Sequence, residues 1–184
     1  MNKMFECPLW SHTPMFLWEN RQAVRAKFVD AFGNLASHGF LLDSGAIIST
    51  MTRETAETHG VFNKNVINDK AVVGGFTGIM DGRIICVEYL SLGILAVKNT
   101  LFFVPDEKIE VTEVIGANVL NGLIPIPEFD KIDKTTWDAK DKGRIRGRLW
   151  IMKNKNVPEP YFSKSLGVSV ACEVLSQDDA VNQS

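Results

Sequence analysis

Alternation of apolar and polar positions is the main signal along the first two thirds of the chain. In the run Ala23–Phe32, the apolar residues Val24, Ala26 and Phe28 lie on one side and basic residues lie on the other, as in a half-buried strand. Further apolar stretches recur after short intervals at 40–42, 71–73, 84–90, 91–105 and 111–115. Short strands at close spacing predict an all-β barrel or sandwich.

Only two segments favour helix. The segment Thr52–His59 has a capping residue in Thr52 and is followed by Gly60, a common helix stop. Residues Asn118–Leu123 fit one further helical turn. The fold expected from this pattern is therefore an all-β barrel or sandwich with one or two short helices.

Three segments show no regular period. Residues 1–20, rich in Trp, Phe, Met and Pro, indicate an irregular N-terminal arm. The segment 32–39 (FGNLASHG) is typical of a turn. Pro125 and Pro127 are expected to end the regular pattern, because proline lacks the backbone N–H that a sheet or helix uses.

Composition excludes several classes of protein. The 184 residues are 45% hydrophobic and 23% charged, with a net charge of -2 and a pI near 5.9, which argues against a dedicated nucleic-acid binder. Three cysteines and three histidines lack the spacing of a disulfide framework or a metal site, so neither a metal nor a cofactor is expected. No apolar run reaches membrane-spanning length, and a cytoplasmic protein is expected.

The last third of the chain differs in charge. Residues 131–155 carry nine Lys or Arg against three Asp, and Arg144, Arg146 and Arg148 alternate with other residue types as on one face of a strand. A solvated strand face, or a face that pairs with the acidic remainder of the chain, is favoured over a nucleic-acid contact. The predicted organisation is an N-terminal arm (1–22), a barrel domain (23–130) and a basic C-terminal extension (131–184), with a further strand expected within 166–175.

One tetrapeptide stands out as candidate chemistry. Asp43, Ser44, Gly45 and Ala46 directly follow the apolar Phe40–Leu42. A carboxylate at the end of a buried strand is costly unless it is hydrogen-bonded or used. Taken alone, however, an Asp-Ser-Gly sequence is a common strand-ending turn.

Two downstream features change that interpretation. A glycine-rich hairpin tip comprises Gly74, Gly75, Phe76, Thr77 and Gly78, and the apolar pair Val114 and Ile115 is followed by Gly116. In this order, over residues 23–129, the three motifs resemble the retropepsin-like (retroviral-type) aspartic proteases. That family combines an apolar strand entering Asp-Thr/Ser-Gly-Ala, a glycine-rich flap, and an apolar pair plus Gly before a short helix.

The resemblance implies a small closed retropepsin-like β-barrel with a glycine-rich flap hairpin. It also implies an aspartic endopeptidase that hydrolyses peptides or proteins as a homodimer. Each subunit supplies one catalytic Asp43, because the chain contains a single Asp-Ser/Thr-Gly sequence. By the same resemblance, Ser44, Gly45 and Ala46 support the pair of carboxylates: the Ser44 hydroxyl braces it and Gly45 leaves room for the catalytic water. Residues 74–78 are implied to form a flap over the substrate. No nucleic-acid or membrane partner is expected.

The chain also departs from the family pattern. Ile47 stands where an acidic residue is common, and Ala117 and Asn118 stand where a charged residue often follows the glycine. Two alternatives therefore stay open: a non-catalytic retropepsin-fold protein for dimerisation or peptide binding, and an oligonucleotide-binding barrel that uses the basic extension. If the chain is a protease, we expect an apolar cleft that favours apolar side chains of the substrate. The residues expected to build this cleft include Ile47, Ile79, Ile84 and Val114.

Overall fold

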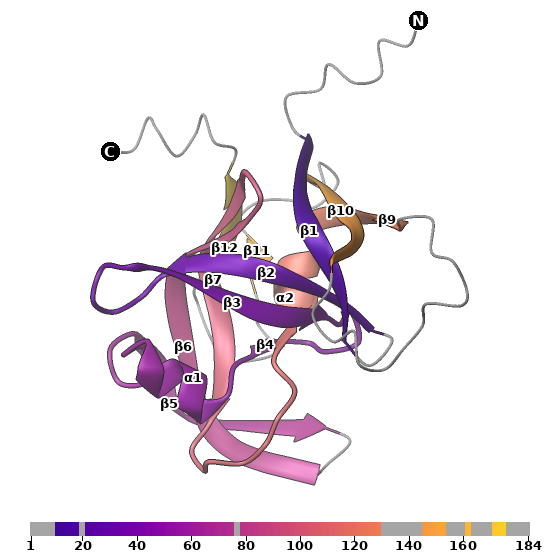
Figure 1. Cartoon of the computed structure of the whole chain (residues 1–184). Helices are drawn as coiled ribbons and strands as arrows, with labels where there is room; N and C mark the ends of the chain where they lie inside the picture. Colours follow the sequence, from indigo (N-terminus) through magenta and orange to yellow (C-terminus); the bar gives the residue numbers. More distant parts are fainter. Residues whose placement is uncertain are drawn as a thin grey trace, which may run out of the picture.

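The computed structural model describes residues 10–18, 21–75, 78–129, 145–153, 161–162 and 171–175 (Figure 1). Twelve strands and two short helices make up this part of the chain. In chain order they are β1 (Trp10–Trp18), β2 (Arg21–Val29), β3 (Leu35–Leu42), β4 (Ser49–Thr50), α1 (Arg53–Thr58), β5 (Val66–Gly75), β6 (Gly78–Leu92), β7 (Leu95–Pro105), β8 (Val114–Ile115), α2 (Ala117–Leu120), β9 (Leu123–Phe129), β10 (Ile145–Lys153), β11 (Tyr161–Phe162) and β12 (Ala171–Leu175).

Six strands close into a barrel. Strand β2 pairs with β3 on one side and β6 on the other, and the ring continues from β6 through β7, β4 and β8 back to β3. Because the ring is closed, each of these six strands pairs with another strand on both of its sides. The predicted all-β barrel with a glycine-rich hairpin and short helices is confirmed.

The barrel interior is filled by the apolar faces of the alternating strands. Val24, Ala26 and Phe28 of β2 are all at most 1% exposed, whereas Arg25 and Lys27 between them are exposed, as the sequence pattern predicts. The largest wholly buried side chains include four phenylalanines, at positions 28, 40, 102 and 103. Burial of these large aromatic surfaces supplies the main driving force for closing the barrel.

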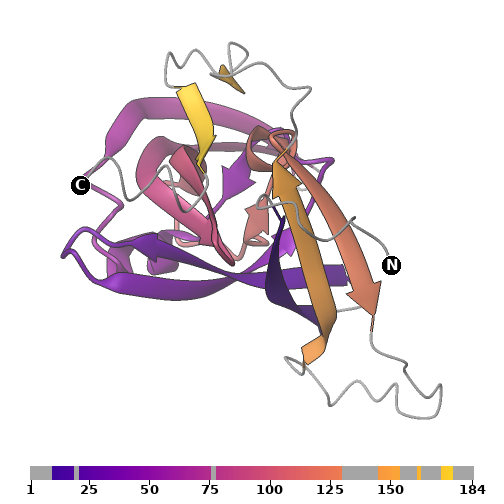
Figure 2. The same cartoon turned by 90° about the horizontal axis from the view of Figure 1, so that it is seen from above.

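Three further strands form a three-stranded extension of the barrel's sheet at one end. Strand β10 pairs with β1 and with β9, both antiparallel, and β1 continues onto β2 (Figure 2). The expectation of an irregular arm over residues 1–20 is therefore wrong for Trp10–Trp18. The expectation that Pro125 and Pro127 end the regular pattern is also wrong, since β9 runs through both. The division of the chain at residues 22 and 130 stays a prediction.

The remaining local predictions have mixed outcomes. Helix α1 begins after Thr52, whose side-chain oxygen accepts from the Thr55 backbone N–H, and Gly60 follows its end, as predicted. The turn between β2 and β3 is shorter than expected, because β3 already begins at Leu35. Within the described residues, no helix is both long and apolar enough to cross a membrane.

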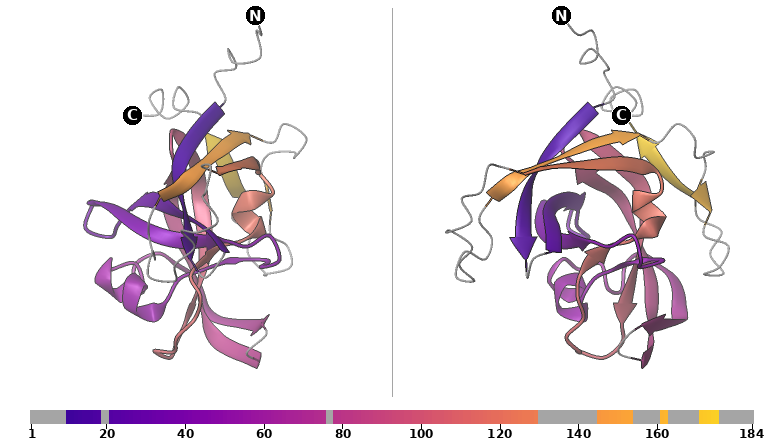
Figure 3. Two further views of the ribbon diagram at one scale, coloured as in Figure 1. Left: turned by 45° about the vertical axis from the view of Figure 1, so that its right-hand side comes forward. Right: turned by 90° about the vertical axis from the view of Figure 1, so that its right-hand side faces the viewer.

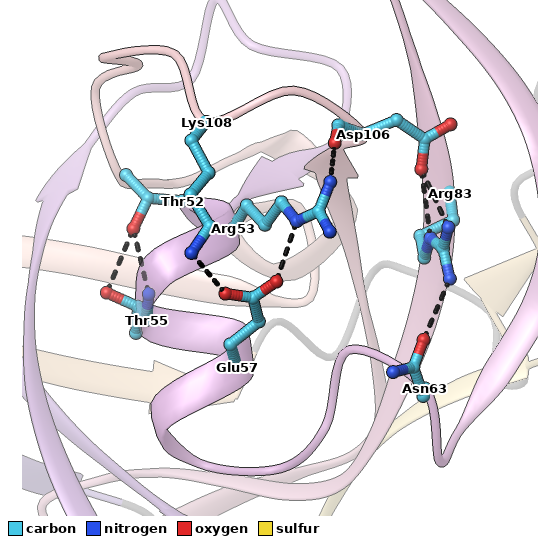
Figure 4. A network of polar contacts seen from close by, with 8 residues as sticks. All are labelled: Thr52, Arg53, Thr55, Glu57, Asn63, Arg83, Asp106 and Lys108. Carbon is cyan, nitrogen blue, oxygen red and sulfur yellow. Dashed lines mark hydrogen bonds and ion pairs between the residues drawn. The ribbon is translucent and has the colours of Figure 1, made fainter.

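A polar network fixes the base of the β5–β6 hairpin, which projects from the barrel at the end opposite the three-stranded sheet (Figures 1 and 3). The buried ring of Phe62 contacts two guanidinium groups, whose central carbons lie 4.6 Å (Arg53) and 3.9 Å (Arg83) from the ring centroid. Arg83, on β6, donates to the Asp106 carboxylate at 2.8 Å and to Asn63 at 3.1 Å (Figure 4). Cation–π contacts and charge-assisted hydrogen bonds thus join β6 to the segment that follows β7.

The same network holds helix α1. Arg53 donates to Glu57 at 2.7 Å and to the Asp106 carbonyl, and Lys108 pairs with Glu57 at 2.8 Å (Figure 4). Hydrogen bonds from Lys108 and Arg53 lower the pKa of Glu57, although the modest burial of its carboxylate acts in the opposite direction. Helix α1, the hairpin base and residues 106–108 are therefore one connected unit.

Gly82 tests how tightly the hairpin base is packed. A Cβ at this position would lie 2.7 Å from the Phe103 ring and closer still to the Val104 carbonyl oxygen. Because neither group can move freely, we expect Gly82→Ala to lower the free energy of unfolding by about 2 kcal/mol in chemical denaturation. Gly74→Ala, with no atom within 4 Å of the added carbon, is the control and should change stability little. Equal effects of the two substitutions would show that the base is not close-packed.

Candidate active site

Asp43 lies in an exposed loop immediately after β3. Its carboxylate Oδ1 accepts from the Gly45 backbone N–H at 2.9 Å, and its carbonyl accepts from the Ala46 N–H at 3.2 Å. These two bonds form a tight aspartate turn, in which the side chain replaces a backbone acceptor. Asp43, Ser44 and Gly45 are exposed and Ala46 is half-buried. The carboxylate is thus oriented by its own loop and open to a second group.

Strand β8 lies between the two strands that flank this loop. Leu42 of β3 pairs with Ile115 in parallel, and Thr50 of β4 pairs with Val114 in antiparallel fashion. The Asp43 backbone N–H donates to the Ile115 carbonyl at 3.0 Å. The chain that carries Asp43 therefore passes around Val114 and Ile115. This brings the Asp43 motif and the Val114–Gly116 motif together in one site.

Gly116 allows the closest approach in the site. A Cβ at this position would lie 2.7 Å from the Ala46 carbonyl oxygen, closer than real Cβ contacts occur. The next two backbone N–H groups, of Ala117 and Asn118, donate to the Ala46 and Ile47 carbonyls at 2.7 and 3.2 Å. The start of helix α2 thereby satisfies the polar groups of the loop that follows Asp43.

Asn118 is a buried residue whose contribution the sequence did not reveal. Its Oδ1 accepts from the Ser49 backbone N–H at 2.7 Å and from the Ser49 hydroxyl at 2.8 Å. Its Nδ2 donates to the Leu101 carbonyl at 2.9 Å, and the Ser49 Oγ accepts from the Gly116 N–H at 3.0 Å. Both side chains are at most 3% exposed. One amide therefore links helix α2, β4 and β7 beneath the Asp43 loop. The available signal was an asparagine within a run of apolar residues.

Glu113, just before β8, links the same region to helix α1. Its Oε1 accepts from the Thr52 backbone N–H and hydroxyl, both at 3.0 Å, and its Oε2 accepts from His38 Nε2. Its carbonyl accepts from the Leu41 N–H at 3.0 Å, two residues before Asp43. Burial alone would raise the pKa of Glu113, but the hydrogen bonds and charge of His38, together with the Thr52 and Thr55 bonds, hold it below its usual value.

The predicted flap residues lie at the end of the β5–β6 hairpin. Gly74, Gly75 and Gly78 are exposed, and Gly75 pairs with Gly78. Phe76 and Thr77 lie outside the described residues. The hairpin projects away from the barrel and does not lie over α2 (Figures 1 and 3).

The four apolar residues expected to contact substrate divide into two pairs. Ile47, beside the Asp43 loop, and Ile79, on the hairpin, are 66% and 81% exposed. Ile84 and Val114 are 1% and 5% exposed, so they belong to the core, and the expectation that they contact substrate is wrong. Val114 also occupies β8, where its backbone pairs with strands on both sides.

The chemistry available at this site is that of one oriented, accessible carboxylate. Among the described residues, no group of three His, Cys, Asp or Glu side chains is arranged to hold a metal ion. His38, the histidine on the strand that leads to Asp43, is bonded to Glu113. A carboxylate in this setting can act as a general base, or share a proton with a second carboxylate brought beside it.

Comparison with known proteins gives a likeness to a solved structure and none to a known sequence. No family model matches the chain, and no curated protein sequence is significantly similar to it. Among solved structures, the chain is similar to a retropepsin-like aspartic protease from Rickettsia conorii. The two share 15% sequence identity with a TM-score of 0.47, over 77% of this chain and 90% of the other.

The buried amide of Asn118 should be essential for stability. Asn118→Ala leaves the Ser49 N–H and the Leu101 carbonyl without their partner in a dry environment, so we expect the free energy of unfolding to fall by about 2–3 kcal/mol. Asn34→Ala, at an exposed asparagine in the β2–β3 turn, is the control and should cost less than about 1 kcal/mol. Denaturant titrations of both variants measure the difference, and a loss at Asn118 no larger than at Asn34 would contradict this assignment.

The Glu113 interactions should make stability depend on pH in a defined direction. Because the folded pKa of Glu113 lies below its unfolded value, near 4.5, its contribution is complete above that value and is lost as the pH falls through the folded pKa. We expect Glu113→Gln to destabilise the protein by about 1–2 kcal/mol at about pH 6, with a smaller difference at about pH 3. Denaturation at several pH values, with the exposed Glu110→Gln as control, measures this. A pH-independent difference would refute it.

Proposed function

We propose that the protein is an aspartic endopeptidase in which two copies of the chain each contribute Asp43 to one catalytic pair. The observation that carries this proposal is the setting of Asp43: an exposed carboxylate at the end of a barrel strand, oriented by the Gly45 N–H and anchored through its own N–H to Ile115. The chain has a single Asp-Ser-Gly sequence, so the second carboxylate must come from a second chain.

The reaction follows from the properties of paired carboxylates. Two such groups at hydrogen-bond distance cannot both ionise cheaply, so the pair holds one proton. The ionised Asp43 removes a proton from a water molecule, and the resulting hydroxide attacks the peptide carbonyl carbon. The protonated Asp43 donates to the carbonyl oxygen. When the tetrahedral intermediate collapses, the C–N bond breaks and the amine nitrogen takes a proton from the pair.

The surrounding residues receive roles consistent with this chemistry. Ser44, which is exposed next to Asp43, braces the opposing loop. The Asp43 loop keeps its geometry because the backbone N–H groups of Ala117 and Asn118 donate to its carbonyl groups. The glycine-rich hairpin, residues 74–78, acts as a flap over an extended peptide. Exposed Ile47 and Ile79 favour apolar side chains in the substrate.

The test is cleavage of a mixed peptide library, from acid to neutral pH, by the wild type and by Asp43→Asn. We expect the substitution to reduce cleavage by at least about a thousandfold, because an amide can neither accept nor donate the catalytic proton. Sedimentation should show the same oligomeric state for both proteins.

Asp30→Asn is the matched control. Asp30 also orients a turn, since its Oδ1 accepts from the Phe32 and Asn34 N–H groups at 2.9 and 2.8 Å, but it lies between β2 and β3. This variant should cleave as the wild type does. Undiminished cleavage by Asp43→Asn would disprove the proposal, and absence of cleavage by a dimeric wild type would favour a peptide-binding role instead.

A further inference from the structure

Strand β9 is the terminal strand of the extended sheet. The strand order along this end is β2, β1, β10, β9, with β9 paired to β10 alone among the described strands (Figure 2). The order means that β10, which comes after residue 130, occupies the place between the first strand of the chain and β9. One chain therefore builds this three-stranded sheet without strands from another.

The prolines of β9 face its open edge. The ladder between β9 and β10 is continuous from Leu123 to Phe129, and proline has no N–H to donate. A continuous antiparallel ladder therefore requires the N–H groups of Ile124, Ile126 and Glu128 to point toward β10. Pro125 and Pro127 then point the opposite way and leave the centre of the open edge without donors.

Strand β1 supports the same assignment independently. In the β1–β10 register, Pro14 lies opposite Arg148, and Arg148 lies opposite Glu128 of β9. If Arg148 uses its N–H and carbonyl toward Glu128, it needs no donor from Pro14. All three prolines next to β10 thus direct their missing N–H away from it, which is where a sheet tolerates proline.

The apolar side chains of β9 lack cover. Residues directly opposite each other in a sheet point to the same face. Ile151 and Leu149 of β10 are at most 1% exposed, yet their partners on β9, Pro125 and Pro127, are exposed. Phe129, on the same face of β9, is 47% exposed. The core-facing side of the sheet therefore continues onto β9, where nothing in the described part of the chain covers it.

The other face of β9 adds to this surface. Ile126 is 44% exposed, and the one charged residue of the strand, Glu128, accepts a hydrogen bond from Trp150 Nε1 at 2.7 Å. Its carboxylate is therefore engaged within its own chain. An exposed, nearly uncharged strand of this kind is typical of a protein interface.

We propose that a second copy of this chain covers β9, with the two β9 strands side by side and held by Pro, Ile and Phe side chains, not by a continuous backbone ladder. This inference rests on the proposed function, because the single Asp43 makes the catalytic pair incomplete without a second copy. A twofold contact brings the same patch of each chain together, so an apolar strand whose one carboxylate is already hydrogen-bonded within its own chain is self-complementary. In a pairing centred on Ile126, Pro125 lies opposite Pro127 of the second copy, and neither can donate.

The absence of central backbone bonds has a consequence for assembly. A contact that relies on a few apolar side chains dissociates more readily than one reinforced by strand pairing. Activity per chain should therefore fall on dilution, in step with the loss of dimer. Assembly of the catalytic pair is in this way sensitive to protein concentration.

The first test measures the dimer dissociation constant of the full-length chain by sedimentation velocity over a range of concentrations. Phe129→Ser should raise this constant at least about tenfold, because it removes a large apolar side chain from the contact. Phe32→Ser is the matched control, since Phe32 is 69% exposed at the distant β2–β3 turn. Circular dichroism should show both variants folded. An unchanged constant for Phe129→Ser, or a wild type that stays monomeric throughout, overturns the proposal.

The second test restores the missing donors. The double substitution Pro125→Ala and Pro127→Ala gives each β9 two N–H groups on its open edge, so the two strands can form a ladder across the twofold contact. We expect the dissociation constant to fall at least about tenfold. An unchanged or weaker dimer would show that the two edges do not lie against each other.

Cleavage assays on the same samples separate this inference from the proposed function. A wild type that dimerises through β9 but does not cleave peptides refutes the protease and leaves the interface standing. Cleavage by Phe129→Ser with an undiminished dimer refutes the interface and leaves the protease standing.

Discussion

The passage of the Asp43 loop around strand β8 is the constraint on which the site depends. A loop that leaves one strand and returns as another normally has its backbone groups in water. Here Ile115 accepts from the Asp43 N–H, and the first residues of α2 donate to the carbonyls of Ala46 and Ile47. The loop is therefore bound to the barrel interior on one side while its carboxylate stays exposed on the other. The same hydrogen bonds therefore fix the position of the Asp43 carboxylate and keep it accessible to solvent.

This arrangement depends on two buried residues of opposite kinds. Gly116 lets two backbones approach more closely than any side chain permits, and Asn118 supplies three hydrogen-bonding contacts where the backbones separate. A buried amide is tolerated only when its groups are satisfied, and here each has a partner. Glu113 extends the same principle to helix α1, because one carboxylate accepts from Thr52, the capping residue of the helix, and from His38. The polar interior of the site is thus a positioning frame for a single exposed carboxylate.

The sequence predicted features that depend on local pattern. Alternation in β2 identified its buried face, Thr52 and Gly60 bounded α1, and the Asp43 and Val114–Gly116 motifs meet in space. Features that depend on distant contacts were missed or mistaken. Trp10–Trp18 is a strand because β10 and β2 pair with it. The sequence of this segment has no clear period and does not indicate those partners. Ile84 and Val114 were mistaken for cleft residues because apolar character alone does not distinguish a residue that lines a cleft from one buried in the core.

The rule that proline ends regular structure fails for Pro125 and Pro127, yet these residues still indicate which edge of β9 is paired. Proline was expected to end regular structure, since it cannot complete a ladder on both sides. At a sheet edge only one side needs donors, and the alternation of Pro125 and Pro127 places both on the other side. The same residues that made β9 look irregular thus specify which of its edges is bound. Because the other edge, unpaired among the described strands, carries apolar side chains and few donors, it disfavours the addition of a further strand by a continuous backbone ladder. The N–H groups that Pro125 and Pro127 lack therefore limit which strands can pair with this edge, as much as its apolar side chains do.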